Sequence, residues 1–264
     1  MHYEIQYSCI NHIGKIRTMN QDNFICEGSY LELDNANNGF STSGYVTTNS
    51  PSLFGVFDGM GGEECGEVAA HIAAKTASTF DFSQDSVAML TQYCQTANES
   101  ICKYAVEYSV SAMGTTAAML LFSKKQITLC NIGDSKIFRF SQDKLDQISK
   151  DHVVLTTFGK KPPLSQCLGI PSSEMLIEPY LAQGRYKNGD IYLICSDGLT
   201  DMVANDEIKK VLSDHSVQEA ISVLLKKAID NGGKDNITII LLETKCVKNK
   251  LFKSFNKSTG GNKL

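Results

Sequence analysis

Several features that mark membrane-spanning, secreted and disulfide-stabilised proteins are missing from this sequence. No apolar run is long enough to cross a bilayer, and the first residues lack the basic and apolar regions of a secretory signal. None of the nine cysteines forms a C-x-x-C pair, and their number is odd. We therefore interpret the cysteines as small buried hydrophobic residues in a reducing compartment, and we expect a cytoplasmic protein without a transmembrane segment.

Acidic residues are missing from the end of the chain. Six lysines follow Glu243, so residues 1–244 carry a net charge of about −10 although the whole chain carries −4. A body with this charge is not expected to bind nucleic acid. We expect one domain at residues 3–244 and a basic tail at residues 245–264. Two interpretations of the tail stay open: a solvated, disordered segment, or an electrostatic contact with an acidic partner or an anionic membrane surface.

The spacing of apolar residues predicts an α+β fold. Strands are expected at residues 3–10, 24–33, 53–57, 115–122, 126–131, 136–140, 190–195 and 237–242, and helices at 63–80, 86–108, 206–212 and from 216 to the Gly232-Gly233 pair. Residues 35–52 are rich in Asn, Ser, Thr and Gly, which predicts a surface loop or a loose hairpin. Strands and helices occur in blocks, which favours antiparallel layers over a doubly wound parallel sheet.

Four aspartates fall at the ends of apolar strand candidates, namely Asp58, Asp134, Asp197 and Asp235. Carboxylates gathered near a core repel one another and lose hydration, and a bound cation removes both penalties. Hard oxygen ligands without a His or Cys cluster beside them favour Mg²⁺ or Mn²⁺ over Zn²⁺ or copper. A single Asp-Gly pair usually marks only a turn, but four such aspartates together favour a metal site.

Arg17 lies in a predicted loop between two strand candidates. Its planar guanidinium matches phosphate oxygens in a bidentate manner. An isolated arginine is usually an ordinary surface residue. Beside a cluster of acids, Arg17 also fits a role in binding a phosphate that is held by metal ions.

A set of ordered motifs makes the chain recognisable. They are Gly14-x-x-Arg17-x-x-Asn20-Gln21-Asp22, Phe57-Asp58-Gly59-Met60-Gly61-Gly62, Gly114-Thr115-Thr116, Asn131-Ile132-Gly133-Asp134-Ser135, Asp151-His152, Leu168-Gly169, Cys195-Ser196-Asp197-Gly198-Leu199-Thr200-Asp201 and Asp235-Asn236-Ile237-Thr238. Each motif is weak alone, whereas the ordered set is specific. From about Tyr3 to Glu243 the chain resembles the metal-dependent protein phosphatases of the PPM family, the protein phosphatase 2C-like enzymes, in their bacterial form.

This resemblance implies a four-layer α-β-β-α sandwich, in which two packed antiparallel sheets are flanked by helices. It also implies hydrolysis of phosphoserine and phosphothreonine on proteins by direct attack of a water that bridges two metal ions, without a phosphoenzyme. The implied partners are phosphorylated proteins made by a serine/threonine kinase. The sequence has no Cys-x5-Arg loop, which disfavours the cysteine-dependent phosphatases.

The resemblance also implies roles for individual residues. Asp58 would bridge two Mn²⁺ or Mg²⁺ ions, and Asp197 and Asp235 would complete the first metal site. The backbone carbonyl of Gly59 would bind the second metal, and Asp22 would hold a metal-bound water.

The resemblance further implies that Arg17 would hold the substrate phosphate. Asp134 would help to bind a third, weaker ion with Asp197 and Asp201. The chain departs from the eukaryotic pattern at Gln21, where a glutamate is expected, and at Met60, where a histidine is expected. Because Met60 cannot donate a proton, a metal-bound water is our candidate for protonating the leaving alkoxide. Bacterial-type members share both departures, so neither indicates an inactive protein.

Two alternatives to a general phosphatase stay open. One is a catalytically silent member that binds a phosphoprotein as a regulatory module. Its signature would be the loss of Asp58, Asp197 or Asp235, and none is lost. The other is an active enzyme with a single regulatory protein as its substrate.

The stretch between Asp151-His152 and Leu168-Gly169 is usually longer in bacterial relatives, where it forms a mobile flap. Here it has fifteen residues, 153–167, and includes Lys160, Lys161 and two prolines. This composition predicts a short basic turn and an open metal centre. We therefore expect weak discrimination among short phosphopeptides, with selectivity coming from docking elsewhere or from the two lysines.

Overall fold

The computed structural model describes residues 2–60, 65–124, 126–154 and 162–247, and their strands form two antiparallel sheets. Sheet A has the order β3-β1-β12-β11-β8-β9. Its strands are β1 (His2–His12), β3 (Phe40–Thr47), β8 (Lys136–Ser141), β9 (Lys144–Gln147), β11 (Ile191–Cys195) and β12 (Ile237–Val247).

Sheet B has the order β10-β7-β6-β4-β2, and the short strand β5 pairs with the end of β4. Its strands are β2 (Asp22–Cys26), β4 (Ser52–Met60), β5 (Gly114–Thr115), β6 (Ala117–Ser123), β7 (Gln126–Ile132) and β10 (Tyr180–Gly184).

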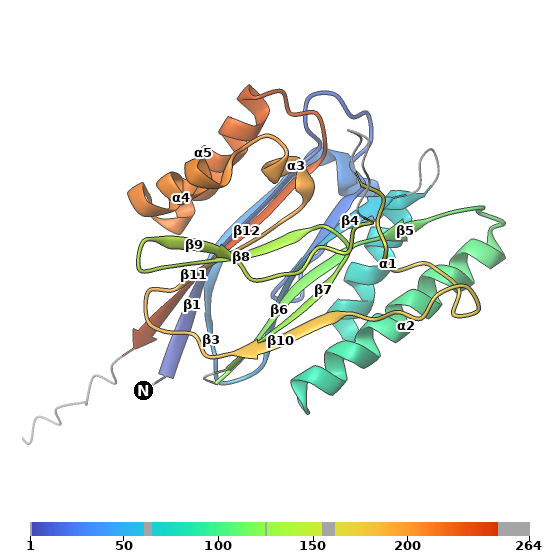
Figure 1. Cartoon of the computed structure of the whole chain (residues 1–264), viewed down its shortest axis with the longest axis horizontal. Coiled ribbons are helices and arrows are strands. Elements are labelled where there is room, and N and C mark those ends of the chain that lie inside the picture. Colours follow the sequence, from blue (N-terminus) through green and yellow to red (C-terminus); the bar gives the residue numbers. More distant parts are fainter. Residues whose placement is uncertain (1, 61–64, 125, 155–161, 248–264) are drawn as a thin grey trace, which may run out of the picture.

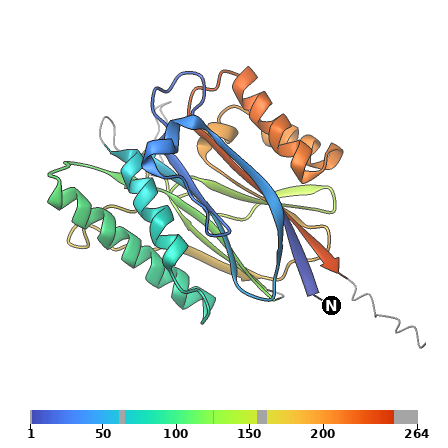
Figure 2. The same ribbon diagram turned by 180° about the vertical axis from the view of Figure 1, so that it is seen from behind.

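Helices cover the outer face of each sheet (Figures 1 and 2). The long helices α1 (Gly66–Thr79) and α2 (Ser86–Glu107) pack on sheet B, and α4 (Asn205–Asp214), α5 (Val217–Asp230) and the short α3 (Asp197–Thr200) pack on sheet A. A 3-10 helix, η1 (Leu33–Asn38), precedes β3. The expected four-layer α-β-β-α sandwich is confirmed.

Strand β12 shows why its sequence is an unbroken apolar run. Side chains alternate between the two faces of a strand. Ile239 and Leu241 pack against the helices on sheet A, whereas Ile240 and Leu242 pack against sheet B. Because both faces are buried, neither set of positions can be polar without a partner.

Two expected elements near the start of the chain were wrong in extent. Residues 35–52 form neither one surface loop nor a loose hairpin, because residues 40–47 of this stretch form β3, which pairs with β1 along its length. The β3 side chains alternate between partly buried and exposed, which is the pattern of an edge strand with one covered face. The strand expected at 24–33 ends at Cys26, because Glu27 and Gly28 adopt positive φ values of 49° and 75° and turn the chain.

Several short elements were not predicted from the sequence, namely β5, β9, β10 and α3. At the end of the chain, β12 continues through Lys245 to Val247, which lies opposite His2 of β1 (Figure 1). The rest of the basic tail lies outside the described residues. In the part of the chain that the structure describes, no helix is long and apolar enough to cross a membrane.

Candidate metal centre

Asp22 and Asp58 face each other across the two neighbouring strands β2 and β4. The backbone of Asp58 is fixed by Thr116, whose Oγ1 accepts from Asp58 N at 3.0 Å and whose N donates to Asp58 O at 2.9 Å. Like charges at directly opposite positions of an antiparallel pair destabilise it. The strand register therefore places two carboxylates where a cation between them would be stabilising.

Asp22 belongs to sheet B but is held by hydroxyl groups of the sheet A side. Ser196 Oγ donates to Asp22 Oδ2 at 2.7 Å, and Thr238 Oγ1 donates to the same oxygen at 2.6 Å. The pKa of Asp22 is raised to about 6, mainly by burial and also by the charge of Asp235, although these two hydroxyl bonds and the charge of Arg17 act to lower it. Asp22 is thus a buried carboxylate at the junction of the two sheets.

A polar network extends from Thr238 toward the start of the chain. Asn11 Nδ2 donates to Thr238 Oγ1 at 2.8 Å, and Asn20 Nδ2 donates to Asn11 Oδ1 at 2.5 Å. All of these side chains are buried, so each needs its partner. The network orients the hydroxyl of Thr238 toward Asp22.

Asp197 is the first residue of α3 and is buried. The helix approaches the start of β12 closely at Gly198, where a Cβ atom would lie 1.9 Å from the carbonyl oxygen of Asn236. Only glycine allows this contact. The contact brings Asp197 next to the segment that carries Asp235.

Arg17 forms an ion pair with Asp235, with 2.8 Å between Nη2 and Oδ2. This bond is the main cause of the raised pKa of Arg17, and the charges of Asp58 and Asp22 also raise it. The guanidinium is about half exposed, with 49% of the side chain accessible. Arg17 therefore lies among three of the predicted metal ligands and still has an open side.

The loop that carries Arg17 is anchored by Asn236. Its Nδ2 donates to the carbonyl oxygens of Ile13 and Met19 at 2.9 and 3.0 Å, and its Oδ1 accepts from Gln21 N at 2.8 Å. Asn236 thus holds both ends of the loop against the start of β12. The position of Arg17 depends on this anchor.

Gly59 follows Asp58 in β4, and Asp134 follows the end of β7. A Cβ atom on Gly59 would lie 2.2 Å from the carbonyl oxygen of Gly66, so glycine is needed for α1 to begin against β4. Asp134 is buried and is followed by Ser135, whose hydroxyl lies 2.7 Å from Thr116 Oγ1. Thr116 therefore connects the turn of Asp134 to the strand of Asp58. Asp201, at the end of α3, is exposed.

This set of groups fits a divalent metal by its chemistry. Mg²⁺ and Mn²⁺ prefer oxygen ligands, and the predicted ligands Asp58, Asp134, Asp197 and Asp235, together with Asp22 for a metal-bound water, are all carboxylates. Among the described residues, no three His, Cys, Asp or Glu side chains converge as tightly as the ligands of a bound ion. The bond from Arg17 to Asp235 would also have to loosen when that carboxylate binds a metal.

The carboxylates were predicted from the sequence, but the residues that position Asp22 were given no role. Ser196 and Thr238 occur in the motifs, yet Asn11 was not singled out at all. The available signal was polarity in a strand: buried Thr238 lies between Ile237 and Ile239, and buried Asn11 follows Ile10. Such positions need a hydrogen-bond partner and therefore point to a network.

Two packed antiparallel sheets flanked by helices, with carboxylates at their junction, are the features expected of a metal-dependent phosphatase. Comparison with known families identifies the same class of protein. The model of the protein phosphatase 2C family matches residues 41–234. Because this match covers well over half of the chain, the chain belongs to the protein phosphatase 2C family, in its bacterial, PPM-type form.

Similar bacterial proteins are serine/threonine phosphatases. The chain is 31% identical over 217 residues to the serine/threonine phosphatase stp of Listeria welshimeri, covering 74% of this chain and 85% of that protein. It is 30% identical over 206 residues to the serine/threonine protein phosphatase PstP of Mycobacterium tuberculosis, covering 72% of this chain and 40% of PstP. The crystal structure of the PstP catalytic domain with two manganese ions superposes with a TM-score of 0.74 at 26% identity, covering 92% of this chain and all of that domain.

Proposed function

We propose that this chain is a metal-dependent protein phosphatase that hydrolyses phosphoserine and phosphothreonine on cytoplasmic proteins. The observation that carries the proposal is the gathering of Asp22, Asp58 and Asp235 around Arg17 at the junction of the two sheets. The phosphatases named above support it by similarity. The partners would be phosphorylated proteins made by a serine/threonine kinase.

The carboxylates would hold two Mn²⁺ or Mg²⁺ ions. Asp58 would contact both ions, Asp197 and Asp235 would complete one site, and the carbonyl of Gly59 would complete the other. When bound, the ions lower the pKa of a water molecule and offset charge on the phosphoryl group. Asp134 would contribute to a third, weaker site together with Asp197.

Arg17 would bind the phosphate of the substrate. Its half-exposed guanidinium can present two N–H groups to two phosphoryl oxygens, and the phosphate would replace Asp235 as its partner. Ser196 and Thr238 both donate to Oδ2 of Asp22 and fix this carboxylate in place. Its other oxygen, Oδ1, would accept a hydrogen bond from a water molecule at the site. Met60 has no acidic proton, so the leaving alkoxide would take its proton from water.

Direct attack by water, without a covalent intermediate, agrees with the state of the cysteines. Burial raises the pKa of Cys167 to about 11 and that of Cys195 to about 12. Burial also raises the pKa of Cys102. These thiols stay protonated at neutral pH and are poor nucleophiles.

The test is hydrolysis of an aryl phosphate with Mn²⁺, with excess chelator, and with the Asp58→Asn variant. We expect activity only in the metal-loaded wild type. Asp206→Asn, on the exposed first turn of α4, is a matched control that should keep full activity. A metal-loaded wild type that binds phosphopeptides without hydrolysing any phosphate ester would favour the silent regulatory member instead.

A further inference from the structure

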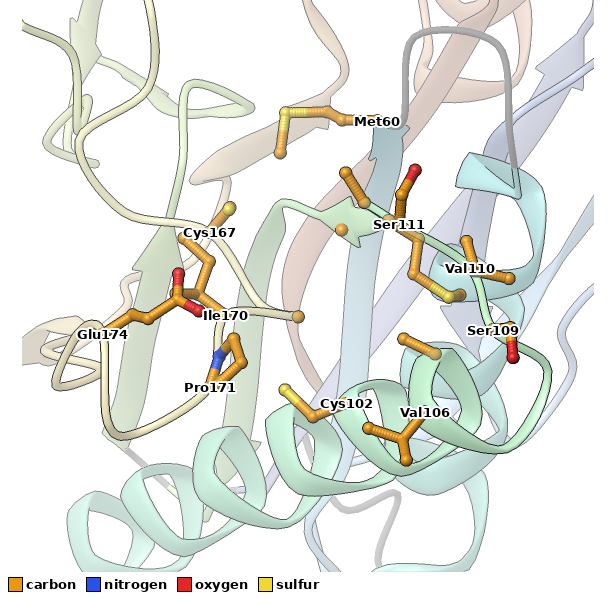
Figure 3. Close-up of a pocket in the computed structure, with 15 residues that line it drawn as sticks. Met60, Cys102, Val106, Ser109, Val110, Ser111, Cys167, Ile170, Pro171 and Glu174 are labelled. Carbon is orange, nitrogen blue, oxygen red and sulfur yellow. The ribbon is translucent and has the colours of Figure 1, made fainter.

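A groove lies beside the metal centre, between the C-terminal half of α2 and two chain segments (Figure 3). Residues 109–114 form one side and residues 167–174 form the other, with α2 below and Met60 at one end. Its volume is about 690 Å³. This is the size range in which proteins enclose side chains or small ligands.

The walls of the groove are largely apolar. Val106, Val110, Met113, Ile170 and Pro171 contribute to them. Among the described residues that line the groove, Glu174 alone carries a charge. Val106 stands on its rim with 83% of its surface exposed. An apolar hollow with one acid at its side is complementary to an apolar side chain accompanied by a basic one.

The groove is continuous with the metal centre through β4 and β5. Met60 is paired with Gly114, and Gly59 is paired with Thr115. Thr115 Oγ1 in turn donates to the carbonyl oxygen of Asp58 at 3.1 Å. The residues that end the groove are therefore neighbours of the predicted metal ligands Asp58 and Gly59, and a chain that leaves the centre across Met60 enters the groove.

We propose, on the basis of the phosphatase function proposed above, that this groove binds the segment of the substrate protein next to its phosphorylated residue. A large apolar side chain of that segment lies against the wall near Val106 and Met113. A lysine or arginine of the same segment pairs with Glu174, which is exposed at the side of the groove. The groove would thus be a source of selectivity besides the basic turn predicted at residues 153–167, of which residues 155–161 lie outside the described part of the chain.

The experiment compares kcat/KM for phosphothreonine peptides that carry either leucine or serine at each position from four residues before to four residues after the phosphothreonine. A second series carries arginine, glutamine or glutamate at the same positions. We expect leucine to raise kcat/KM on the order of tenfold at positions on one side of the phosphothreonine. Arginine should be preferred over glutamate on that same side.

Two variants test the assignment to this groove. Val106→Glu places a charge on the apolar rim and should reduce the preference for leucine to less than about twofold. Glu174→Lys should reverse the preference from arginine to glutamate. The matched controls are Gln95→Glu, exposed elsewhere on α2, and Glu178→Lys, exposed just beyond the groove; both should leave the preferences unchanged.

Aryl phosphate hydrolysis separates this inference from the function on which it rests. All four variants should hydrolyse the small substrate like the wild type, because none of the changed residues is among the predicted metal ligands. If the wild type hydrolyses aryl phosphate and peptides but shows no preference for leucine or arginine, the groove proposal is wrong. It is also wrong if the preferences persist unchanged in Val106→Glu and Glu174→Lys. Loss of all aryl phosphate hydrolysis by the metal-loaded wild type would instead overturn the phosphatase function.

Discussion

Replacing Thr238 by valine tests the hydroxyl network around Asp22. Valine keeps the branched shape of threonine but removes the hydroxyl. The change deletes the 2.6 Å hydrogen bond to Asp22 Oδ2 and leaves Asn11 Nδ2 without the acceptor that it now has at 2.8 Å. Both losses occur in a fully buried environment, so water cannot replace the missing partner.

The size of the effect follows from the kind of bond that is lost. A hydrogen bond to a charged group contributes about 1.5–3 kcal/mol, and a buried donor left without a partner adds a cost of similar size. We expect Thr238→Val to lower the free energy of unfolding of the metal-free protein by about 3 kcal/mol or more at pH 7.5. Thr238→Ser keeps the hydroxyl and loses one methyl group, so its cost should stay near 1 kcal/mol.

The same substitution should change metal binding. The hydroxyl of Thr238 favours the ionised form of Asp22, so its removal raises the pKa of that carboxylate above its value of about 6. A carboxylate must lose its proton to interact favourably with a cation, so metal affinity falls as the pH drops through this pKa. In the wild type the affinity for Mn²⁺ should therefore fall below about pH 6, and in Thr238→Val it should begin to fall at higher pH.

The measurements are urea unfolding of the chelated protein and calorimetric titration with Mn²⁺ between pH 5.5 and 8. A Thr238→Val protein as stable as the wild type within about 0.5 kcal/mol would refute the reasoning, since that is the range of neutral surface changes. An equal loss in Thr238→Ser would show that packing of the methyl group, and not the hydroxyl, is responsible.

Three further predictions concern the metal ions, Arg17 and the end of the chain. Excess chelator should abolish hydrolysis of an aryl phosphate and added Mn²⁺ should restore it, whereas Asp58→Asn should stay inactive yet fold, because it removes one of two opposed carboxylates; full activity in chelator would contradict the metal centre. Arg17→Ala should raise KM about tenfold or more and keep Mn²⁺ affinity near that of the wild type, as measured by titration, because the guanidinium is assigned to phosphate; a loss of metal binding with unchanged KM would show a different role. A chain truncated after Val247 should hydrolyse aryl phosphate like the full chain. A chain truncated before Lys245 should have a lower melting temperature than the one that ends at Val247, because residues 245–247 pair with β1. Equal melting temperatures of the two truncated chains would contradict this.

The layered fold and the acidic centre were predictable because each rests on a local pattern. Apolar runs such as residues 237–242 identify strands that are buried on both faces, and an aspartate next to such a run is visible in the sequence. The partners of Asp22 were not predictable in this way. Ser196 and Thr238 lie 174 and 216 residues further along the chain, and only the packing of the two sheets brings them to one oxygen atom.

Composition misled the prediction at β3, which is rich in small polar residues. The serines, threonines and glycine of β3 are typical of loops, but pairing with β1 satisfies its backbone and gives it a regular structure. Asp197 was expected at the end of a strand, whereas it begins α3. The four-residue length of that helix is too short for a periodic signal, and its position depends on the close contact of Gly198 with Asn236.

The position of β12 in sheet A has a consequence for how this protein is made. It lies between β1 and β11, so the sheet consists of two separate parts until β12 is in place. Yet β12 is the last strand of the described chain to leave the ribosome, and β1 is the first. Throughout synthesis β1 therefore keeps an open edge that can pair with other chains, and closing the sheet requires contact between residues more than 200 positions apart. Asp235 and Thr238 arrive with the same final segment, so a growing chain would carry no complete metal centre and would remain inactive until the sheet closes.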